Sequence, residues 1–401
     1  MHAVELLQTM TEKSCPDIHQ KRVNCVFEVV TSLIACGKLW ISALGRGIQN
    51  QTTAKHNIKK VDTLVGNDRL HQERLMYYKF LSTLWIGDKK RPIIIIDWSP
   101  VSGDCRHYFL RASVTGIGRT LTLYEEVHEL KFYANPEIHK QFLNKLNGVL
   151  PAGCRPIVVT DAGFRNTWFS LVLQQGWDFI GRLRYNTFVK MKIGSNWQNV
   201  RTLHAQATRT PKFLGKVSVA RQNPLEVNMY IVLEKRKGRF KKTRHGKKCI
   251  SSNSNKYSKG AKEPWVLVTS LNHNKTSAKK IVKLYKFRMQ IEASFKDIKN
   301  KRYGFRLPES GTKNVQRLEN LILIAFLATA AIWLAGQAAI NNQWHYQMQA
   351  NTVRDQAILS IAFIGLHVLR NLLFYELNEN ELLAAIQPIK NSVMDYDCAN
   401  I

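Results

Sequence analysis

The segment PIIIIDWS, Pro92–Ser99, constrains the fold of this chain more than any other. Four consecutive β-branched isoleucines are typical of a central strand that is buried on both faces. Two further strand-like runs follow at residues 105–114 and 119–127, separated by Thr115–Gly118. A short glycine-containing break between two such runs predicts a hairpin. The chain from Pro92 onward is therefore expected to form the centre and one hairpin of a sheet.

The elements after this hairpin alternate between helix and strand. They are a helix over 136–150, a strand over 155–161, a helix over 166–175 and a strand over 177–182. Three strands followed by helix, strand, helix and strand is the order of a ribonuclease-H-like fold, a mixed sheet with helices on its faces. The fold class predicted for this part of the chain is therefore α/β.

Other regions interrupt or flank this core. Residues 184–277 contain additional strand-like runs, which predict an inserted β subdomain. Within it, Lys235–Lys248 packs nine Lys or Arg into 14 residues, and so charged a tract is expected to be a mobile loop. Residues 1–90 and the chain from 278 onward show helical spacing of their apolar residues. The core is thus predicted to lie between helical N- and C-terminal regions.

Charge is the outlier in the composition. The 401 residues include 59 Lys or Arg against 29 Asp or Glu, a formal net charge of +30 at pH 7. Such an excess predicts a polyanionic partner, of which nucleic acid is the first to consider. Lys55, Lys59 and Lys60 fall on the first turns of a helix expected to open at Thr52 or Thr53, which suits contacts to phosphates and base edges. An ordinary solvated basic helix is the alternative.

Two features bear on where the protein works. Seven cysteines without a C-x-x-C pair indicate reduced, cytosolic thiols, and the first residues lack the pattern of a signal peptide. The apolar run Leu321–Gly336 has 16 residues without a charge, fewer than the about 20 that span a bilayer. We therefore expect a buried core helix there, with a membrane segment as the alternative.

Two aspartates stand at the ends of predicted central strands. Asp97 follows the four isoleucines, and Asp161 ends the run IVVTD before Ala-Gly-Phe. Functional side chains of open α/β sheets gather where the strands leave the core. Either aspartate alone would also be explained as a turn cap. On strands that are expected to be neighbours, the two carboxylates would converge on one metal ion.

A third carboxylate belongs to the helical stretch YKFRMQIEASFKDIK. At about 100° per residue, Tyr285, Arg288, Glu292 and Lys299 would share one face of a helix. A surface ladder of ion pairs would explain Arg288 and Glu292, which stand four residues apart. It would leave Tyr285 and the two strand-end aspartates unexplained.

These residues resemble the three catalytic blocks of DDE cut-and-paste transposases, in the bacterial insertion sequence four family. Asp97 lies in IIDWS, Asp161 in VVTDAGF, and a Tyr-x2-Arg-x3-Glu-x6-Lys signature runs from Tyr285 to Lys299. The resemblance covers nearly the whole chain. It implies that Asp97, Asp161 and Glu292 are catalytic and hold two Mg²⁺ or Mn²⁺ ions, which suit oxygen ligands and phosphoryl transfer.

The same resemblance implies DNA-binding roles for other residues. Arg288 would clamp a phosphate bidentately, Lys299 would supply a point charge, and Tyr285 would supply a hydroxyl. Trp265, just before the apolar run of its strand, would stack a base that is flipped out when the cleaved DNA end forms a hairpin. By its residue type alone, Trp265 would be assigned to the core.

The implied function is transposition of an insertion sequence by nicking, hairpin formation and resolution, and strand transfer to target DNA. A homodimer would act on the terminal inverted repeats of its own element, beside the nucleoid of a bacterial cytoplasm and without a membrane. The alternatives are a ribonuclease-H-like nuclease or junction resolvase without strand transfer, a non-enzymatic DNA-binding protein and, last, a membrane protein. The expected domains are 1–90 for DNA-end binding, 91–183 and 278–335 for the catalytic core, 184–277 for the β insertion and 336–401 for dimerisation.

Overall fold

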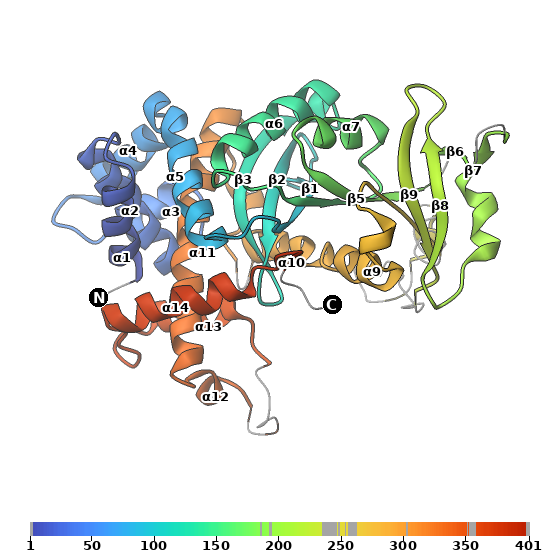
Figure 1. Ribbon diagram of the computed structural model, residues 1–401. Coiled ribbons are helices and arrows are strands. Elements are labelled where there is room, and N and C mark those ends of the chain that lie inside the picture. The colour runs from blue at the N-terminus through green and yellow to red at the C-terminus, as the bar shows by residue number, and fades with distance from the viewer. Residues whose placement is uncertain are drawn as a thin grey trace. The chain divides into compact units, whose positions relative to one another are not determined.

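The computed structural model describes residues 3–184, 187–191, 195–234, 247, 249–252, 254–255, 263–301, 304–350, 352 and 358–397 (Figure 1). The chain divides into two compact units. The first unit comprises Met1–Pro156 with Met289–Asn400, and the second comprises Ile157–Arg288. The predicted mobile loop, Lys235–Lys248, lies outside the described residues except for Lys247.

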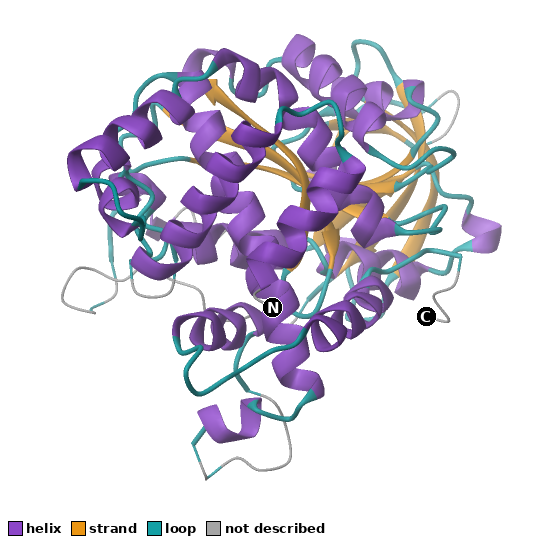
Figure 2. Cartoon of the chain, turned by 90° about the vertical axis from the view of Figure 1, so that its left-hand side faces the viewer, coloured by secondary structure: helices purple, strands orange, loops and turns teal. Residues whose placement is uncertain are grey.

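The first unit combines helices from both ends of the chain with an antiparallel sheet. Its N-terminal helices, which face the viewer in Figure 2, are α1 (Ala3–Ser14), α2 (Gln20–Cys36), α3 (Ile41–Gly47), α4 (Ala54–Val65) and α5 (Asp68–Ile86). The sheet and its helix follow as β1 (Ile93–Pro100), β2 (His107–Thr115), β3 (Thr120–Glu129) and α6 (Pro136–Val149). The C-terminal helices are α10 (Met289–Lys299), α11 (Val315–Asn341), α12 (His345–Met348), α13 (Ile361–Arg370) and α14 (Glu379–Ser392).

The predicted central strand and hairpin form the sheet of the first unit. β2 pairs antiparallel with both β1 and β3, and the register of the first pair runs from Ile94 opposite Val114 to Pro100 opposite Tyr108. The isoleucines of β1, Ile93–Ile96, are all fully buried. From Asp97 the strand becomes only half-buried. The isoleucine run thus anchors β1, and the strand emerges from the core at the first predicted catalytic residue.

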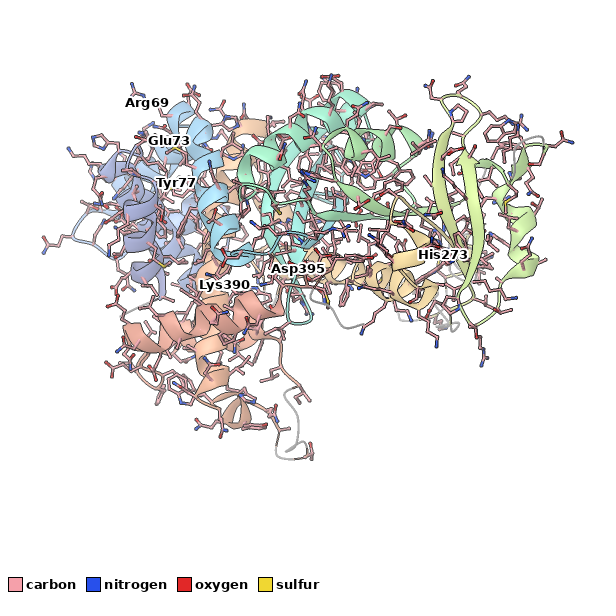
Figure 3. The ribbon with its side chains drawn as sticks, viewed as in Figure 1. Arg69, Glu73, Tyr77, His273, Lys390 and Asp395 are labelled. Atoms are coloured by element: carbon pink, nitrogen blue, oxygen red, sulfur yellow. The ribbon has the colours of Figure 1, made fainter. Side chains whose placement is uncertain are left out.

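α5 is joined to the other N-terminal helices by both polar and apolar contacts. Arg69, Glu73 and Tyr77 follow one another along it (Figure 3). Glu73 pairs with Arg22 of α2, whereas Tyr77 is fully buried. Because residues four apart lie on one helix face, this side of α5 passes from solvent into the core along its length.

The apolar run predicted as a core helix belongs to α11. This helix is long and apolar enough to cross a membrane, but 94% of its most apolar window is buried inside the structure. It packs against α13, α14, α2 and β3. A Cβ atom on Gly365 of α13 would lie 1.9 Å from the carbonyl oxygen of Ile332, so the two helices cross with almost no space between their backbones. α11 therefore forms the core of the first unit.

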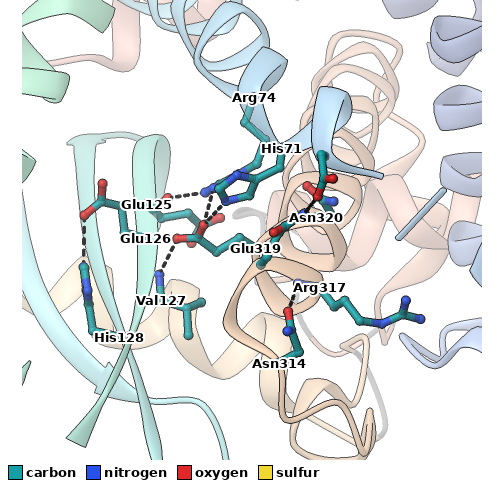
Figure 4. A network of polar contacts seen from close by, with 12 residues as sticks. His71, Arg74, Glu125, Glu126, Val127, His128, Asn314, Arg317, Glu319 and Asn320 are labelled. Atoms are coloured by element: carbon teal, nitrogen blue, oxygen red, sulfur yellow. Dashed lines mark hydrogen bonds and ion pairs between the residues drawn. The ribbon is translucent and has the colours of Figure 1, made fainter. Parts of the chain in front are cut away.

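A buried ion-pair network ties α5, β3 and α11 together (Figure 4). Glu319 of α11 pairs with His71 and Arg74 of α5 and accepts a hydrogen bond of 2.9 Å from the backbone N–H of Val127. Arg74 also donates to the carbonyl of Glu125, at 2.9 Å. Since a charge in the interior is stable only when paired and hydrogen-bonded, these contacts fix how the three elements pack.

The second unit begins with a parallel pair and continues as an antiparallel sheet. β4 (Ile157–Thr160) runs parallel to β5 (Asp178–Leu183), and β5 pairs antiparallel with β10 (Trp265–Thr269). The sheet then continues through β9 (Leu225–Val232), β8 (Lys212–Val219), β6 (Phe188–Lys190) and β7 (Gln198–Asn199). The strand-like runs of residues 184–277 are therefore strands that extend the sheet of β4 and β5.

Two helices cover the β4–β5 part of that sheet. α7 (Asn166–Gln174) packs on β5, and α9 (Ala278–Lys286) packs on β4 and β5. The side of α9 that faces the sheet carries its buried residues, Ile281, Val282, Leu284 and Tyr285. Strands with covering helices make the second unit, like the first, a mixed α/β structure.

Candidate active site

The end of β1 carries the first predicted catalytic residue. Asp97 Oδ1 accepts the backbone N–H of Trp98 at 2.9 Å. The indole N–H of Trp98 donates to Nε2 of His139 on α6 at 3.1 Å. Burial, reinforced by the nearby His128, lowers the pKa of His139 to about 4, so its ring is neutral at pH 7 and can accept this bond. Neighbouring side chains thus hold the end of β1 in place.

Asp97 and Glu292 line the same cleft, whose volume is about 500 Å³. The cleft is walled by Asp97, Trp98, Ser99, Glu292, Phe295, Lys296, Lys299 and Asn300. Residues 195 positions apart in the sequence are therefore brought to one place within the first unit. Two carboxylates on a shared cleft supply hard oxygen donors of the kind that Mg²⁺ and Mn²⁺ prefer.

The helix that carries Glu292 is held on the hairpin of β2 and β3. The hydroxyl of Ser294 accepts the backbone N–H of Thr120 at 2.9 Å and donates to the carbonyl of Thr120 at 3.2 Å. One turn later, Arg119 pairs with Asp297 at 2.8 Å. These contacts fix α10 relative to the sheet whose first strand ends in Asp97.

Lys299 lies in the same cleft with its ammonium close to β1. Its Nζ donates to Oγ of Ser99 at 2.7 Å and lies 5.2 Å and 5.3 Å from the ring centres of Phe295 and Phe109. Burial, together with the charge of Arg111, lowers the pKa of Lys299 to about 8, although Asp97 acts in the opposite direction. The cleft thus holds the ammonium group of Lys299 beside the carboxylates of Asp97 and Glu292.

A buried charge pair beneath the cleft was not predicted from the sequence. Arg111 of β2 pairs with Glu125 of β3 at 2.6 Å, and both side chains are essentially inaccessible. The guanidinium of Arg111 also lies 4.7 Å from the ring centre of Phe295. Opposite charges within two adjacent apolar strands were the available signal, because a buried charge requires a partner.

The second predicted aspartate lies in the second unit. Asp161 directly follows β4, and its Oδ1 accepts the backbone N–H of Gly163 at 2.7 Å. A Cβ atom on Gly163 would lie 3.0 Å from that same oxygen, so glycine allows the chain to turn closely around the carboxylate. Asp161 therefore caps a turn, as its alternative reading proposes, and it is also only half-buried at the end of a buried strand.

The structure corrects the prediction that Tyr285, Arg288, Glu292 and Lys299 share one face of a continuous helix. α9 ends at Lys286, and Glu292 and Lys299 belong to the separate helix α10. Between them, the N–H groups of Phe287 and Arg288 donate to carbonyls only three residues back. This tighter turn interrupts the α-helical pattern without Pro or Gly, so the sequence gives no warning of it.

Tyr285 and Trp265 meet in the second unit, where several arginines surround them. Their rings pack edge to face with centres 5.1 Å apart, and Trp265 is half-buried whereas Tyr285 is buried. Burial raises the pKa of Tyr285, while the charges of Arg288 and Arg182 act to lower it. Arg182, whose guanidinium lies 5.8 Å from the Trp265 ring centre, was not predicted from the sequence.

The predicted DNA-binding lysines of the N-terminal region lie on α4. Thr53 caps this helix by accepting the N–H of His56, which agrees with the expected start. Lys55, Lys59 and Lys60 are all exposed, and Lys60 pairs with Glu28 of α2. Their exposure permits contact with DNA. It does not distinguish a DNA-binding helix from an ordinary solvated basic helix.

The predicted triad is divided between the units, with Asp97 and Glu292 in the first and Asp161 in the second. Within neither unit do the described residues gather three or more His, Cys, Asp or Glu side chains that would hold a metal ion. The pair in the first unit offers two carboxylates to a divalent cation.

A mixed α/β fold with one aspartate where β1 leaves the core, on the same cleft as a glutamate and a lysine of α10, is compatible with metal-dependent phosphoryl transfer. A family model described as the transposase DDE domain matches residues 88–330. The chain therefore belongs to the DDE transposase family, whose catalytic domain is ribonuclease-H-like. No curated protein matches the chain.

Membership of this family establishes the general activity. The protein is a transposase, a nucleotidyl-transfer enzyme of DNA transposition and recombination whose substrate is DNA. Enzymes of the family generally use divalent metal ions.

Proposed function

We propose that the chain is a cut-and-paste transposase of the insertion sequence four family, similar to the transposase of insertion sequence ten. It would nick the ends of its own element, form and resolve hairpins at them, and join the freed 3' ends to target DNA. The observation that carries the proposal is the cleft of the first unit, where Asp97 and Glu292 face Lys299 within a chain of the DDE family.

We propose Asp97, Asp161 and Glu292 as the residues that hold two Mg²⁺ or Mn²⁺ ions. The ions would make a water or a 3'-hydroxyl more nucleophilic and stabilise the leaving oxygen. The donor set fits, because the cleft supplies carboxylate oxygens from two elements and β4 ends in a third.

Residues beside the carboxylates would orient the DNA. Lys299, held by Ser99 and two aromatic rings, would present a fixed positive charge to a phosphate. Arg288 would bind a phosphate bidentately, and the buried Tyr285 would support Trp265 through their edge-to-face contact. The half-buried indole of Trp265 leaves a surface on which a flipped base would stack.

The flanking regions would bind DNA ends and join two subunits. We assign end binding to residues 1–90, including Lys55, Lys59 and Lys60, and dimerisation to residues 336–401. The chain after α13 supports the second assignment, because Leu373 and Phe374 are 98% and 82% exposed. The complex would work in the cytoplasm, where it meets chromosomal DNA.

Strand transfer is the reaction that tests this function. Purified protein would be incubated with Mg²⁺, a supercoiled plasmid and a labelled duplex that ends in the element's exposed 3'-hydroxyl. We expect label to become covalently joined to the plasmid, since the 3'-hydroxyl displaces a phosphodiester oxygen of the target. Cleavage of branched or flanked DNA without any joined product would instead identify a nuclease or junction resolvase.

A further inference from the structure

The net charge of the protein is concentrated in the second unit. Ile157–Arg288 contains 28 Lys or Arg but only 5 Asp or Glu, and therefore has a formal charge of +23 out of +30. The rest of the chain, with 31 basic and 24 acidic residues, has only +7. A charge distribution this uneven indicates a polyanionic partner for this part of the chain rather than a general requirement for solubility.

The helix α9 displays part of this charge as an ordered stripe. At about 100° per residue, Lys279, Lys283 and Lys286 lie within about 60° of one another around the helix. All three are exposed, on the side of α9 away from its buried apolar residues. Lys286 pairs with Glu234 at 2.8 Å. In the described part of the chain, Lys279 and Lys283 are in no ion pair.

One end of this stripe, at Lys279, works against the stability of the helix that carries it, whereas Lys283 and Lys286 lie in the last turn, where the helix dipole favours positive charge. Positive charges in the first turn are repelled by the N-terminal end of the helix dipole, and α9 has no acidic residue there. Lys279 and Lys283, four residues apart, also repel each other. A bound polyanion would remove both penalties, which gives a physical reason for the pattern that an ordinary solvated helix lacks.

We propose that Lys279 and Lys283 bind adjacent phosphates of duplex DNA beside the reacting end. The two lysines are about 6 Å apart along the helix axis, close to two of the about 3.4 Å steps at which phosphates recur along one strand of duplex DNA, so their flexible side chains would reach neighbouring phosphates. α9 contains Tyr285 and ends two residues before Arg288, so DNA held at these signature residues would continue along the stripe. Contacts of this kind position the duplex without reading its sequence. The inference rests on the proposed function and names a surface that it does not include.

The test is the salt dependence of DNA binding by the full-length protein. Fluorescence anisotropy with a labelled duplex, without divalent metal, would compare the wild type with the double variant K279Q/K283Q. Each lost phosphate contact should reduce the slope of log K against log salt by about 0.9, so the double variant should lose about 1.8. The loss should be the same for a scrambled duplex, because only the backbone is contacted.

A matched control removes the same charge elsewhere. Lys140 and Lys313 are exposed residues of the first unit outside the end-binding region 1–90, and K140Q/K313Q should leave the slope unchanged. The charge-preserving variant K279R/K283R should also retain it. An unchanged slope in K279Q/K283Q, or equal losses in both glutamine variants, would overturn the proposal. If the wild type performed strand transfer while either result appeared, only this inference would fail and the proposed function would stand.

Discussion

In the proposed function, Trp265 would belong both to the packing of the protein and to its reaction. It begins β10, pairs in register with Val232, and packs its ring against Tyr285. Its main chain is thus part of the sheet, whereas its indole is only half-buried. The two roles assigned to it from sequence, core residue and base-stacking platform, are therefore compatible.

Replacing Trp265 with Ala should separate the steps of the reaction. A stacking platform is needed when the DNA strand folds back on itself, but not when the first phosphodiester is hydrolysed. We expect nicking to continue while hairpin formation falls about ten- to a hundredfold, because stacking on an aromatic ring contributes about 1 to 3 kcal/mol. A time course of nicked, hairpin and resolved products would measure this.

Two further variants make the Trp265 experiment specific. Trp265→Phe retains a ring and should keep most of the hairpin formation. An abasic site at the flipped position should partly restore Trp265→Ala, since no base then needs a platform. Equal loss of nicking and hairpin formation in Trp265→Ala would show that the residue acts only through packing.

The sequence singles out Asp97, Asp161 and Glu292, but not the side chains that surround them. Asp97 could be found because an apolar run leads to it, and Asp161 for the same reason. His139 could not, because its hydrogen bond with Trp98 joins elements that are distant in the sequence, and no local pattern records such a contact. Arg111 and Glu125 left a signal, since they are opposite charges within two adjacent apolar strands.

At the scale of elements, the crossing of α11 and α13 depends on glycine. Gly365→Ala would place a methyl group against the backbone of Ile332, so the helices would have to separate. We expect a loss of about 1 to 3 kcal/mol in the free energy of unfolding. Gly148→Ala is the control, since no atom lies within 4 Å of its Cβ position in α6. It should stabilise the protein by about 0.5 to 1 kcal/mol, and equal effects in urea melts would contradict this account.

The network in Figure 4 makes a second prediction about elements. Glu319→Ala would leave Arg74 buried without its carboxylate, which should cost about 3 to 5 kcal/mol of unfolding free energy. Glu129→Ala removes a carboxylate from an exposed pair with Lys131 and should cost less than about 1 kcal/mol. Thermal or urea unfolding of the two variants would compare them. A small effect at Glu319 would mean that hydrophobic contacts alone orient α5, β3 and α11.

Glu126 of β3 predicts how stability depends on pH. Its burial would raise its pKa, but hydrogen bonds from His128, Lys145 and Tyr124 lower it from 4.5 to about 2. A carboxylate whose pKa is lower in the folded than in the unfolded protein stabilises the folded state at pH values above the unfolded-state pKa. This contribution of about 3 kcal/mol disappears as the pH falls from 4.5 through 2. Glu126→Gln should therefore show a smaller loss of unfolding free energy over that range than the wild type. Parallel curves for the two proteins would contradict the assignment.

The helices and strands were largely predictable from the sequence, but the break between two consecutive helices was not. The strand-helix order of residues 92–182 and the buried helix in 321–336 follow from apolar periodicity. The break between α9 and α10 does not. There, backbone N–H groups donate to the carbonyl three residues back instead of four, and no Pro or Gly marks the change. Whether a helix continues through such a turn depends on tertiary packing.

At the scale of the whole molecule, the net positive charge is divided unevenly between the two units. The cleft with Asp97 and Glu292 lies in the nearly balanced first unit, whereas most of the net positive charge lies in the second. Overall charge was enough to predict a nucleic-acid partner. Its distribution became meaningful only once the structure defined the units.

The central claim is that Asp97, Asp161 and Glu292 perform the chemistry while other residues bind the DNA. The most direct test measures cleavage and binding side by side for Asp97→Ala, Asp161→Ala and Glu292→Ala, on a labelled DNA end with Mg²⁺ and by gel shift. Each variant should lose cleavage and strand transfer and still bind the end at close to the wild-type affinity. If any one of the three cut at the normal rate, the assignment of the triad would be wrong.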